Sequence, residues 1–191
     1  MTKRAAGKFK VALNERYITP EAAVLPLIPH LHRTKVRTFV EPCCAERQLI
    51  KILEKHGFDC RMCGDIAGIS GSPPDSAGWM MPAVEPMDAR KWKRADFRNA
   101  DACITNTPWT HELQVEIMMH QSQFVPSWFL VKSDWIFTKQ SGTIMNARCT
   151  DIVPIGRVKW FPDSKSVGFD NCAWVRMTRH KYGATEFWPF Q

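Results

Sequence analysis

The stretch 38–57, TFVEPCCAERQLIKILEKHG, decides the fold class. Thr38-Phe39-Val40 is a short run of β-forming residues that ends at Glu41-Pro42. Residues 45–56 then carry apolar side chains at helical spacing, and Gly57 stands at the usual stop position of a helix. A strand followed at once by an amphipathic helix is the unit from which α/β domains with parallel strands are built.

The same alternation continues on both sides of this unit. We expect further strands at 58–65, 102–105 and 128–131, helices at 20–31 and 111–121, and an antiparallel C-terminal hairpin formed by 152–161 and 171–177. Pro26 and Pro29 should kink or shorten the first helix. The sequence therefore predicts a single α/β domain over 14–191 with a mostly parallel sheet, a basic flexible arm at 1–13, and a Pro- and Gly-rich loop insertion at 67–86.

Composition and charge narrow the class of partner. The 191 residues are 45% hydrophobic, which is enough for a core of ordinary size. Basic side chains outnumber acidic ones by 26 to 19, and the resulting net charge of +7 favours a polyanion as the partner. No apolar run approaches the roughly 18 residues that would span a bilayer, and no signal peptide is evident. We therefore expect a cytoplasmic protein, in a bacterium or a phage-infected host cell, with reduced cysteines.

Three acidic residues follow predicted strands. Glu41 and Asp65 come directly after the first two strands, and Asp88 would follow a further strand if residues 82–88 form one. Ligands of parallel sheets bind at the carboxyl ends of the strands, and a carboxylate after the second strand is the usual partner of a ribose. These acids could hold a ligand rich in hydroxyl groups. Alternatively, each could cap the following helix or face water.

The turn Asn106-Thr107-Pro108-Trp109 after the third of these strands can hold an aromatic amine. The Asn106 side-chain oxygen and the Thr107 carbonyl can each accept one amino hydrogen, and Trp109 offers a stacking face. Pro108 keeps Thr107 out of the α region and so fixes the direction of that carbonyl. Acceptance of both hydrogens localises the nitrogen lone pair and makes the amine nucleophilic. The alternative is a Pro-Trp turn packed beneath the sheet.

In order along the chain, these motifs resemble those of small Rossmann-like, S-adenosylmethionine-dependent DNA methyltransferases of bacteriophages and bacteria, which act on the exocyclic N6 amine of adenine. NERYITPEAAV (14–24) is similar to the family's first cofactor element, an aromatic-x-Thr-Pro sequence. FVEPCC (39–44) is similar to the hydrophobic-Glu-Pro element, where backbone atoms receive the methionine part of the cofactor. NTPW (106–109) stands where the family has Asn or Asp, Pro, Pro and an aromatic residue.

The resemblance implies a Rossmann-like methyltransferase fold, S-adenosylmethionine as the cofactor, and a role for each matching residue. Asp65 would bind the ribose, and Asp88 would lie near the adenine ring. The implied cofactor-binding residues are Tyr17, Thr19, Pro20, Glu41, Pro42, Cys43, Asp65 and Asp88, and the implied catalytic residues are Asn106, Thr107, Pro108 and Trp109. The expected reaction is methyl transfer to the N6 amine of adenine in DNA.

The sequence departs from the family pattern at two places. Ala45 and Arg47 stand where the family has glycines that let the chain approach the cofactor, and Thr107 replaces the first proline of the turn. Two alternatives therefore stay open beside the DNA methyltransferase. One is a nucleic-acid-binding protein whose cofactor site has decayed. The other is the same chemistry on RNA, because adenine presents the same amine there.

A base within a duplex must be flipped out to reach such a turn, and phosphate contacts offset the cost of unstacking. The candidates for those contacts are Arg90, Lys91, Lys93, Arg94, Arg157 and Lys159. The alternative for each is an ordinary solvated charge. DNA is thus the expected partner, with RNA as the second choice.

The cysteines give a weaker signal. Cys60-x-x-Cys63 has the spacing of half a tetrahedral zinc site, with Cys43-Cys44 upstream. The remaining cysteines are single and fall in predicted strands, where a free thiol behaves as a small apolar group. We therefore expect no metal.

Overall fold

The computed structural model describes residues 18–68, 71, 84, 86–161, 163–164 and 167–189. The predicted basic arm at 1–13, Tyr17 and most of the predicted loop at 67–86 lie outside the described residues. The two ends of that loop meet, because the Met87 amide donates to the Asp65 carbonyl at 2.9 Å.

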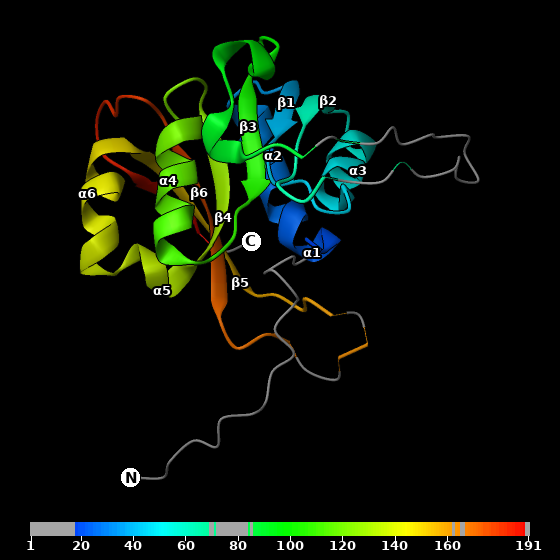
Figure 1. Cartoon of the computed structure of the whole chain (residues 1–191). Coiled ribbons are helices and arrows are strands. Elements are labelled where there is room, and N and C mark those ends of the chain that lie inside the picture. The colour runs from blue at the N-terminus through cyan, green and yellow to red at the C-terminus, as the bar shows by residue number, and fades with distance from the viewer. Residues whose placement is uncertain are drawn as a thin grey trace.

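In the described part of the chain, seven strands form one sheet in the order β2-β1-β3-β4-β6-β5-β7 (Figure 1). The strands are β1 (Thr38–Glu41), β2 (Asp59–Cys63), β3 (Ala102–Asn106), β4 (Ser127–Lys132), β5 (Cys149–Arg157), β6 (Asn171–Met177) and β7 (Glu186–Phe187). β1 to β4 are parallel, whereas β6 is antiparallel to both β4 and β5. This arrangement confirms the predicted α/β class and the C-terminal hairpin.

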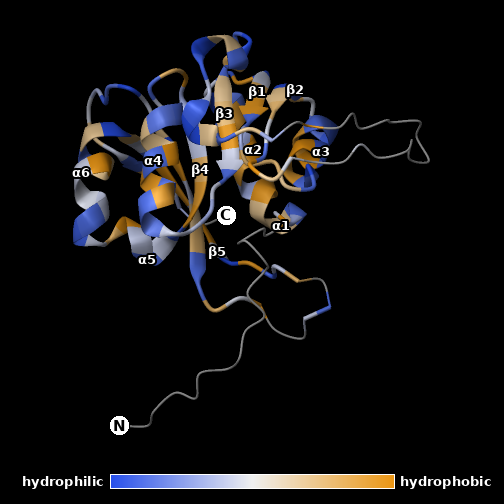
Figure 2. Ribbon diagram, in the orientation of Figure 1, coloured by the Kyte–Doolittle hydropathy of each residue, from blue (hydrophilic) through white to orange (hydrophobic). Residues whose placement is uncertain are grey.

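Helices cover both faces of the sheet. One face carries α1 (Glu21–Val24), the 3₁₀ helix η2 (Leu25–Leu27), α2 (Ile28–Arg33) and α3 (Gln48–Lys55). The other carries α4 (His111–Gln121), α5 (Ser133–Ile136), α6 (Lys139–Arg148) and two 3₁₀ helices, η3 (Ala89–Lys91) and η4 (Arg94–Phe97). In Figure 2, β1, β3 and β4 are largely hydrophobic and the helices α3, α4 and α6 carry hydrophilic segments, as expected for strands buried on both faces.

The first predicted helix is divided into three pieces. Pro26 and Pro29 each lie within the first two positions of a new helical segment, η2 and α2. Proline has no amide hydrogen to continue the ladder of the preceding turn, so the chain starts a new segment at each proline.

The strand directions define two edges of the sheet. β1 to β4 and β5 all run the same way, since β4 and β5 are both antiparallel to β6. We call the edge where these five strands end the carboxyl edge and the opposite one the amino edge. Within the described ranges, no helix is long and apolar enough to cross a membrane.

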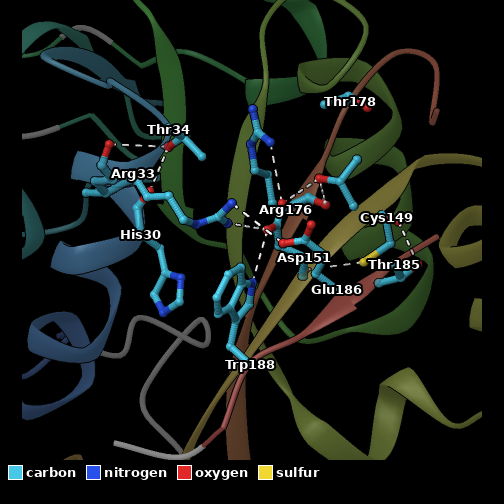
Figure 3. A network of polar contacts seen from close by, with 12 residues as sticks. His30, Arg33, Thr34, Cys149, Asp151, Arg176, Thr178, Thr185, Glu186 and Trp188 are labelled. Atoms are coloured by element: carbon cyan, nitrogen blue, oxygen red, sulfur yellow. Dashed lines mark hydrogen bonds and ion pairs between the residues drawn. The ribbon is translucent and has the colours of Figure 1, made fainter. Parts of the chain in front are cut away.

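A buried carboxylate joins the C-terminal segment to the rest of the domain (Figure 3). Asp151 on β5 is 2% exposed, and its two oxygens accept hydrogen bonds from Arg33 of α2, Thr150 (2.8 Å), Arg176 of β6 (3.4 Å) and the Trp188 indole (3.1 Å). The Arg33 guanidinium also lies 4.2 Å from the centre of the Trp188 ring. Burial acts to raise the pKa of Asp151, but these hydrogen bonds and the charge of Arg176 outweigh it and hold the pKa below its usual value.

Candidate active site

The predicted acids and the Asn-Thr-Pro-Trp turn meet at the carboxyl edge. Glu41 and Asn106 are the last residues of β1 and β3, which are neighbours in the sheet, and Asp65 lies two residues after the end of β2. Parallel packing of the three strands brings their carboxyl ends together, although the residues are up to 65 positions apart in the sequence.

Two adjacent cavities open at this edge. The larger, of about 170 Å³, is lined by Pro42, Cys43, Ala45, Asp65, Ile66, Ala67, Asp88, Ala89, Pro108, Leu113 and Ile117. The smaller is lined by Ile18, Thr19, Glu41, Cys43, Cys44, Ala45, Glu46, Gln48, Leu49 and Asn106. Cys43 and Ala45 belong to both, so the cavities lie side by side. The structure thus brings together all the described residues predicted to bind the cofactor except Pro20, which precedes α1 and lines neither of these two cavities.

Asp65 organises the loop between β1 and α3. It is 7% exposed, and its two carboxylate oxygens accept hydrogen bonds from the backbone amides of Ala45 and Ala67, each at 3.0 Å. The same carboxylate that sequence reasoning assigned to a ligand therefore also holds two loops of the protein in place.

Glu41 is a buried carboxyl at the wall of the smaller cavity. It is 2% exposed, and its Oε2 atom has no hydrogen-bond partner among the described residues. Burial raises the pKa of Glu41 well above its usual value, and the nearby Cys63 and Asp65 raise it further. A buried acceptor without a partner is costly, which makes this atom a candidate for contact with a bound molecule.

The positions where the resembled family has glycines keep a glycine-like backbone. Ala45 and Arg47 have φ angles of 41° and 60°, in the left-handed region that favours glycine. The predicted helix at 45–56 consequently begins only at Gln48. Ala45 and Arg47 were expected to hinder a close approach of the chain to the cofactor. Their backbone nevertheless keeps the conformation that glycine favours.

This strained loop gives a stability prediction. Alanine in the left-handed region costs about 1–2 kcal/mol. Glycine avoids this strain, but its larger loss of conformational entropy on folding offsets part of the gain. Ala45→Gly should therefore raise the free energy of unfolding by about 0.5–1 kcal/mol in urea denaturation. The matched control is Ala22→Gly in α1, which should lower it by about the same amount because Ala22 lies in a helix. Destabilisation by both substitutions would contradict the account of Ala45.

The Asn-Thr-Pro-Trp turn is held by contacts that sequence reasoning missed. Thr107 is buried, and its hydroxyl accepts a hydrogen bond from the Gln114 side chain of α4 at 3.3 Å. Trp109 meets the Trp160 ring edge-to-face, with the centroids 5.1 Å apart, and the Lys132 ammonium lies 5.2 Å from the centroid of the Trp109 ring. The indole is therefore half-buried between the turn and the hairpin.

Asp88 occupies a position different from the one expected. The described residues Met87 and Asp88 are not part of a strand, and Pro86 just before them forms an isolated parallel bridge with Asp65. Instead Asp88 precedes η3, where its carboxylate accepts a hydrogen bond from the Arg90 amide (2.9 Å) and pairs with the Arg90 guanidinium (2.8 Å). The hydrogen bonds from Arg90 lower the pKa of Asp88 despite partial burial, so this residue is ionised at neutral pH. It nevertheless lines the larger cavity, as Asp65 does.

The predicted phosphate-binding residues are divided among three regions. Arg157 and Lys159 are exposed at or just beyond the end of β5, at the carboxyl edge, and Lys91 and Lys93 are exposed around η3. Arg90 is paired with Asp88 and Glu116, which neutralises much of its charge. Arg94 lines a cavity at the amino edge, which is the edge of the sheet opposite the Asn-Thr-Pro-Trp turn.

The cysteines do not assemble a metal site in the described part of the chain, where no group of three or more His, Cys, Asp or Glu side chains could hold a metal ion. Cys44 and Cys63 do contact each other across the ends of β1 and β2. The thiol hydrogen bond from Cys44 lowers the pKa of Cys63 to about 7 against the effect of burial, and the Arg47 charge lowers it further.

Comparisons with known proteins agree with this geometry at the level of the fold. No family model matches the sequence, and no curated protein matches it. The structure is similar to a protein from Listeria monocytogenes described as a class I S-adenosylmethionine-dependent methyltransferase, with a TM-score of 0.57 and 10% identity over 94% of this chain and 67% of the other.

Two further structures are similar. One is a modification subunit of a type I restriction enzyme from Vibrio vulnificus, with a TM-score of 0.54 and 11% identity. The match covers 86% of this chain but only 44% of that subunit. The other is described as an RNA methyltransferase from Pyrococcus horikoshii, with a TM-score of 0.54 and 13% identity over 86% of this chain and 87% of the other. The chain therefore has the Rossmann-like fold of S-adenosylmethionine-dependent methyltransferases.

Proposed function

We propose that this chain binds S-adenosylmethionine and transfers its methyl group to the exocyclic N6 amine of adenine in DNA. The observation that supports this best is the continuity of the site. The cavity between Asp65 and Asp88 adjoins, through Cys43 and Ala45, the cavity that Asn106 lines. A cofactor in the first cavity would thus reach the residue proposed to hold the amine.

The residues around the two cavities fit the cofactor. Asp65 would accept hydrogen bonds from the ribose hydroxyls, and the ionised Asp88 would lie beside the adenine. The buried Glu41 oxygen that has no partner among the described residues would receive a polar group of the methionine part. Thr19, which lines the smaller cavity, would cover that part. When bound, the cofactor supplies an electrophilic methyl group on a sulfonium.

The turn would make the amine nucleophilic without a strong base. The Asn106 side-chain oxygen accepts one amino hydrogen and the Thr107 carbonyl accepts the other, with Pro108 fixing the direction of that carbonyl. The protein otherwise contributes by aligning the amine with the methyl group.

Stacking of the adenine on Trp109 involves Lys132. The ammonium of Lys132 lies over the indole and is also paired with Asp170 at 2.9 Å. Entry of a base would displace the ammonium from the ring, and Asp170 would then hold it. Lys132 could in turn contact a phosphate, because it lies at the carboxyl edge near Arg157 and Lys159.

A nucleic-acid substrate is supported by the net charge of +7 and the exposed cations at the carboxyl edge. DNA is the first candidate because the sequence motifs resemble those of DNA adenine methyltransferases. RNA is the second candidate, supported by the likeness to a protein described as an RNA methyltransferase. A decayed cofactor site is less favoured, because Ala45 and Arg47 keep the left-handed backbone that the loop requires.

The test is transfer of a labelled methyl group to unmethylated DNA and, separately, to RNA, followed by digestion and mass spectrometry of the nucleosides. The expected product is N6-methyladenine in DNA. If N6-methyladenine formed in RNA alone, RNA would replace DNA as the proposed substrate and the proposed chemistry would stand. Nucleic-acid binding without transfer and without affinity for S-adenosylhomocysteine would overturn the proposal.

Replacement of Asp65 tests the cofactor cavity directly. Asp65→Ala should weaken binding of S-adenosylhomocysteine by about 10- to 100-fold in calorimetry, because it removes a charged acceptor and frees the loop held through the Ala45 amide. Asp59→Ala makes the same charge change at an exposed position at the start of β2 and should leave the affinity unchanged. Equal effects of the two substitutions would contradict the placement of the ribose.

A further inference from the structure

A separate cavity of about 500 Å³ opens at the amino edge of the sheet. We call it the amino-edge cavity. It is lined by Arg94, Ser122, Gln123, Phe124, Val125, Pro126, Thr150, Thr178, Arg179, His180 and Tyr182. These residues precede β4, begin β5 and follow β6, and all three positions lie at the end of the sheet opposite the Asn-Thr-Pro-Trp turn.

The lining of the amino-edge cavity is cationic. It contains the guanidinium groups of Arg94 and Arg179 and no Asp or Glu. The nearest buried carboxylate along the chain is Asp151, next to Thr150, and it is already held by Arg33, Arg176 and Trp188 (Figure 3). Arg94 and Arg179 have no ion-pair partner within the described ranges. The cavity therefore presents positive charge that the protein itself leaves uncompensated.

A third guanidinium stands behind the wall of this cavity. Arg148 donates hydrogen bonds to the Met119 carbonyl (3.2 Å) and to the hydroxyl of Ser122 (2.9 Å), which lines the cavity. Both of these acceptors are neutral. Burial and the positive charge of Arg179 lower the pKa of Arg148. An anion beside Arg179 would offset the positive charge that acts on Arg148.

Aromatic rings flank the cations. Phe124 is packed between Phe97 and His120, with ring centroids 5.0 Å and 5.2 Å away, which fixes its orientation at the cavity wall. Tyr182 is 86% exposed. Tyr182 and Phe124 both line the cavity, and the exposed tyrosine ring offers a face on which a planar group can stack.

We propose that the amino-edge cavity binds a phosphate-bearing nucleotide, with the phosphate between Arg94 and Arg179 and the base against Tyr182 and Phe124. Guanidinium groups recognise phosphate oxygens through paired hydrogen bonds, and the bound charge supplies the counter-ion that the cavity lacks. The ligand is either a free mononucleotide or one unit of a single-stranded polynucleotide. This site stands apart from the proposed methyl transfer, because it shares no lining residue with the two cavities at the carboxyl edge.

The experiment uses the full chain with uridine 5′-monophosphate, a 12-residue oligouridine and inorganic phosphate as probes. Uridine avoids the candidate active site, which is proposed to recognise adenine. Titrations are made with S-adenosylhomocysteine present in excess. Saturable binding of the mononucleotide and the oligomer with equal affinity identifies a free nucleotide as the ligand. Much tighter, salt-sensitive binding of the oligomer identifies a polynucleotide.

The variant that carries the test is Arg179→Glu. It should weaken uridylate binding at least about tenfold, while the affinity for S-adenosylhomocysteine stays unchanged. Lys51→Glu on α3 makes the same charge change at an exposed position on the other face and should leave uridylate binding within about twofold. Tyr182→Ala should weaken uridylate binding more than binding of inorganic phosphate, since only the nucleotide stacks.

Either of two results would overturn this proposal while leaving methyl transfer untouched. One is the absence of saturable binding of both uridine probes to the unmodified chain. The other is an equal loss of affinity in Arg179→Glu and Lys51→Glu, which would assign binding to net charge alone.

Discussion

Asn106→Ala should lower the rate of methyl transfer about 100- to 1,000-fold while changing the affinity for S-adenosylhomocysteine by no more than about threefold. This loss of rate is expected because the substitution removes one oriented polar group that would act on the reacting atoms in a desolvated site. Asn106 ends β3 between two buried neighbours, Thr105 and Thr107, so its position is set by the sheet rather than by a mobile loop. In the proposed mechanism, loss of its oxygen would leave one amino hydrogen without an acceptor.

Two further variants separate this role from a structural one. Asn106→Asp keeps an acceptor oxygen at the same place and should restore part of the rate. Asn146→Ala, at an exposed position on α6, should have no effect on the rate. The measurement is single-turnover transfer of labelled methyl with enzyme and cofactor in excess over DNA. Full activity of Asn106→Ala would remove the proposed role of the turn.

Asp151→Asn should lower the free energy of unfolding by about 2–4 kcal/mol at neutral pH. Asparagine carries no charge and keeps only one acceptor oxygen, so the Arg33 and Arg176 guanidiniums lose their buried counter-charge. In addition, either the oxygen that accepts from Arg33 and Trp188 or the one that accepts from Thr150 and Arg176 becomes an amide donor. The expected loss of unfolding free energy lies at the lower end of that seen for broken buried ion pairs, because Arg33 is partly exposed. The control is Asp134→Asn, an exposed carboxylate on α5, with an expected change below about 0.5 kcal/mol.

The pH dependence of the same substitution has a defined sign. Because the pKa of Asp151 is lower in the folded protein than in the unfolded chain, its stabilisation is fully present above the unfolded value of about 3.9. It is lost as the pH falls below that value and through the folded one. The difference between the native chain and Asp151→Asn in urea denaturation should therefore be constant from neutral pH down to about pH 5 and shrink below about pH 4. A difference that grows on acidification would contradict this account.

Local sequence patterns predicted most of the sheet. The β-forming run at 38–40 and the helical spacing after it became β1 and α3, and the final hairpin became β5 and β6. A hydrophobic period of two residues indicates a strand and one of 3.6 residues indicates a helix, and each shows which side of the element is apolar. It does not state which strand lies beside which, so the insertion of β6 between β4 and β5 and the short β7 required the assembled sheet.

Local sequence patterns also predicted part of the candidate site. Parallel strands in an α/β sheet end at one edge, so Glu41, Asp65 and Asn106 could be placed together from the sequence. Asp88 was expected after a strand, and it lies at the start of η3 instead, because its carboxylate caps that turn. The roles assigned to these residues stay predictions until the cofactor and substrate experiments are made.

The sequence by itself determined the α/β class, the edge at which a ligand would bind and the turn that could hold an amine, because each depends on residues adjacent along the chain. Only the tertiary structure decided the packing of Trp109 against Trp160, the left-handed backbone at Ala45, and the ion pair between Arg33 and Asp151, which are 118 positions apart. Such contacts depend on how separate elements close around a shared core. Their energies arise from desolvation and geometry that no local pattern encodes.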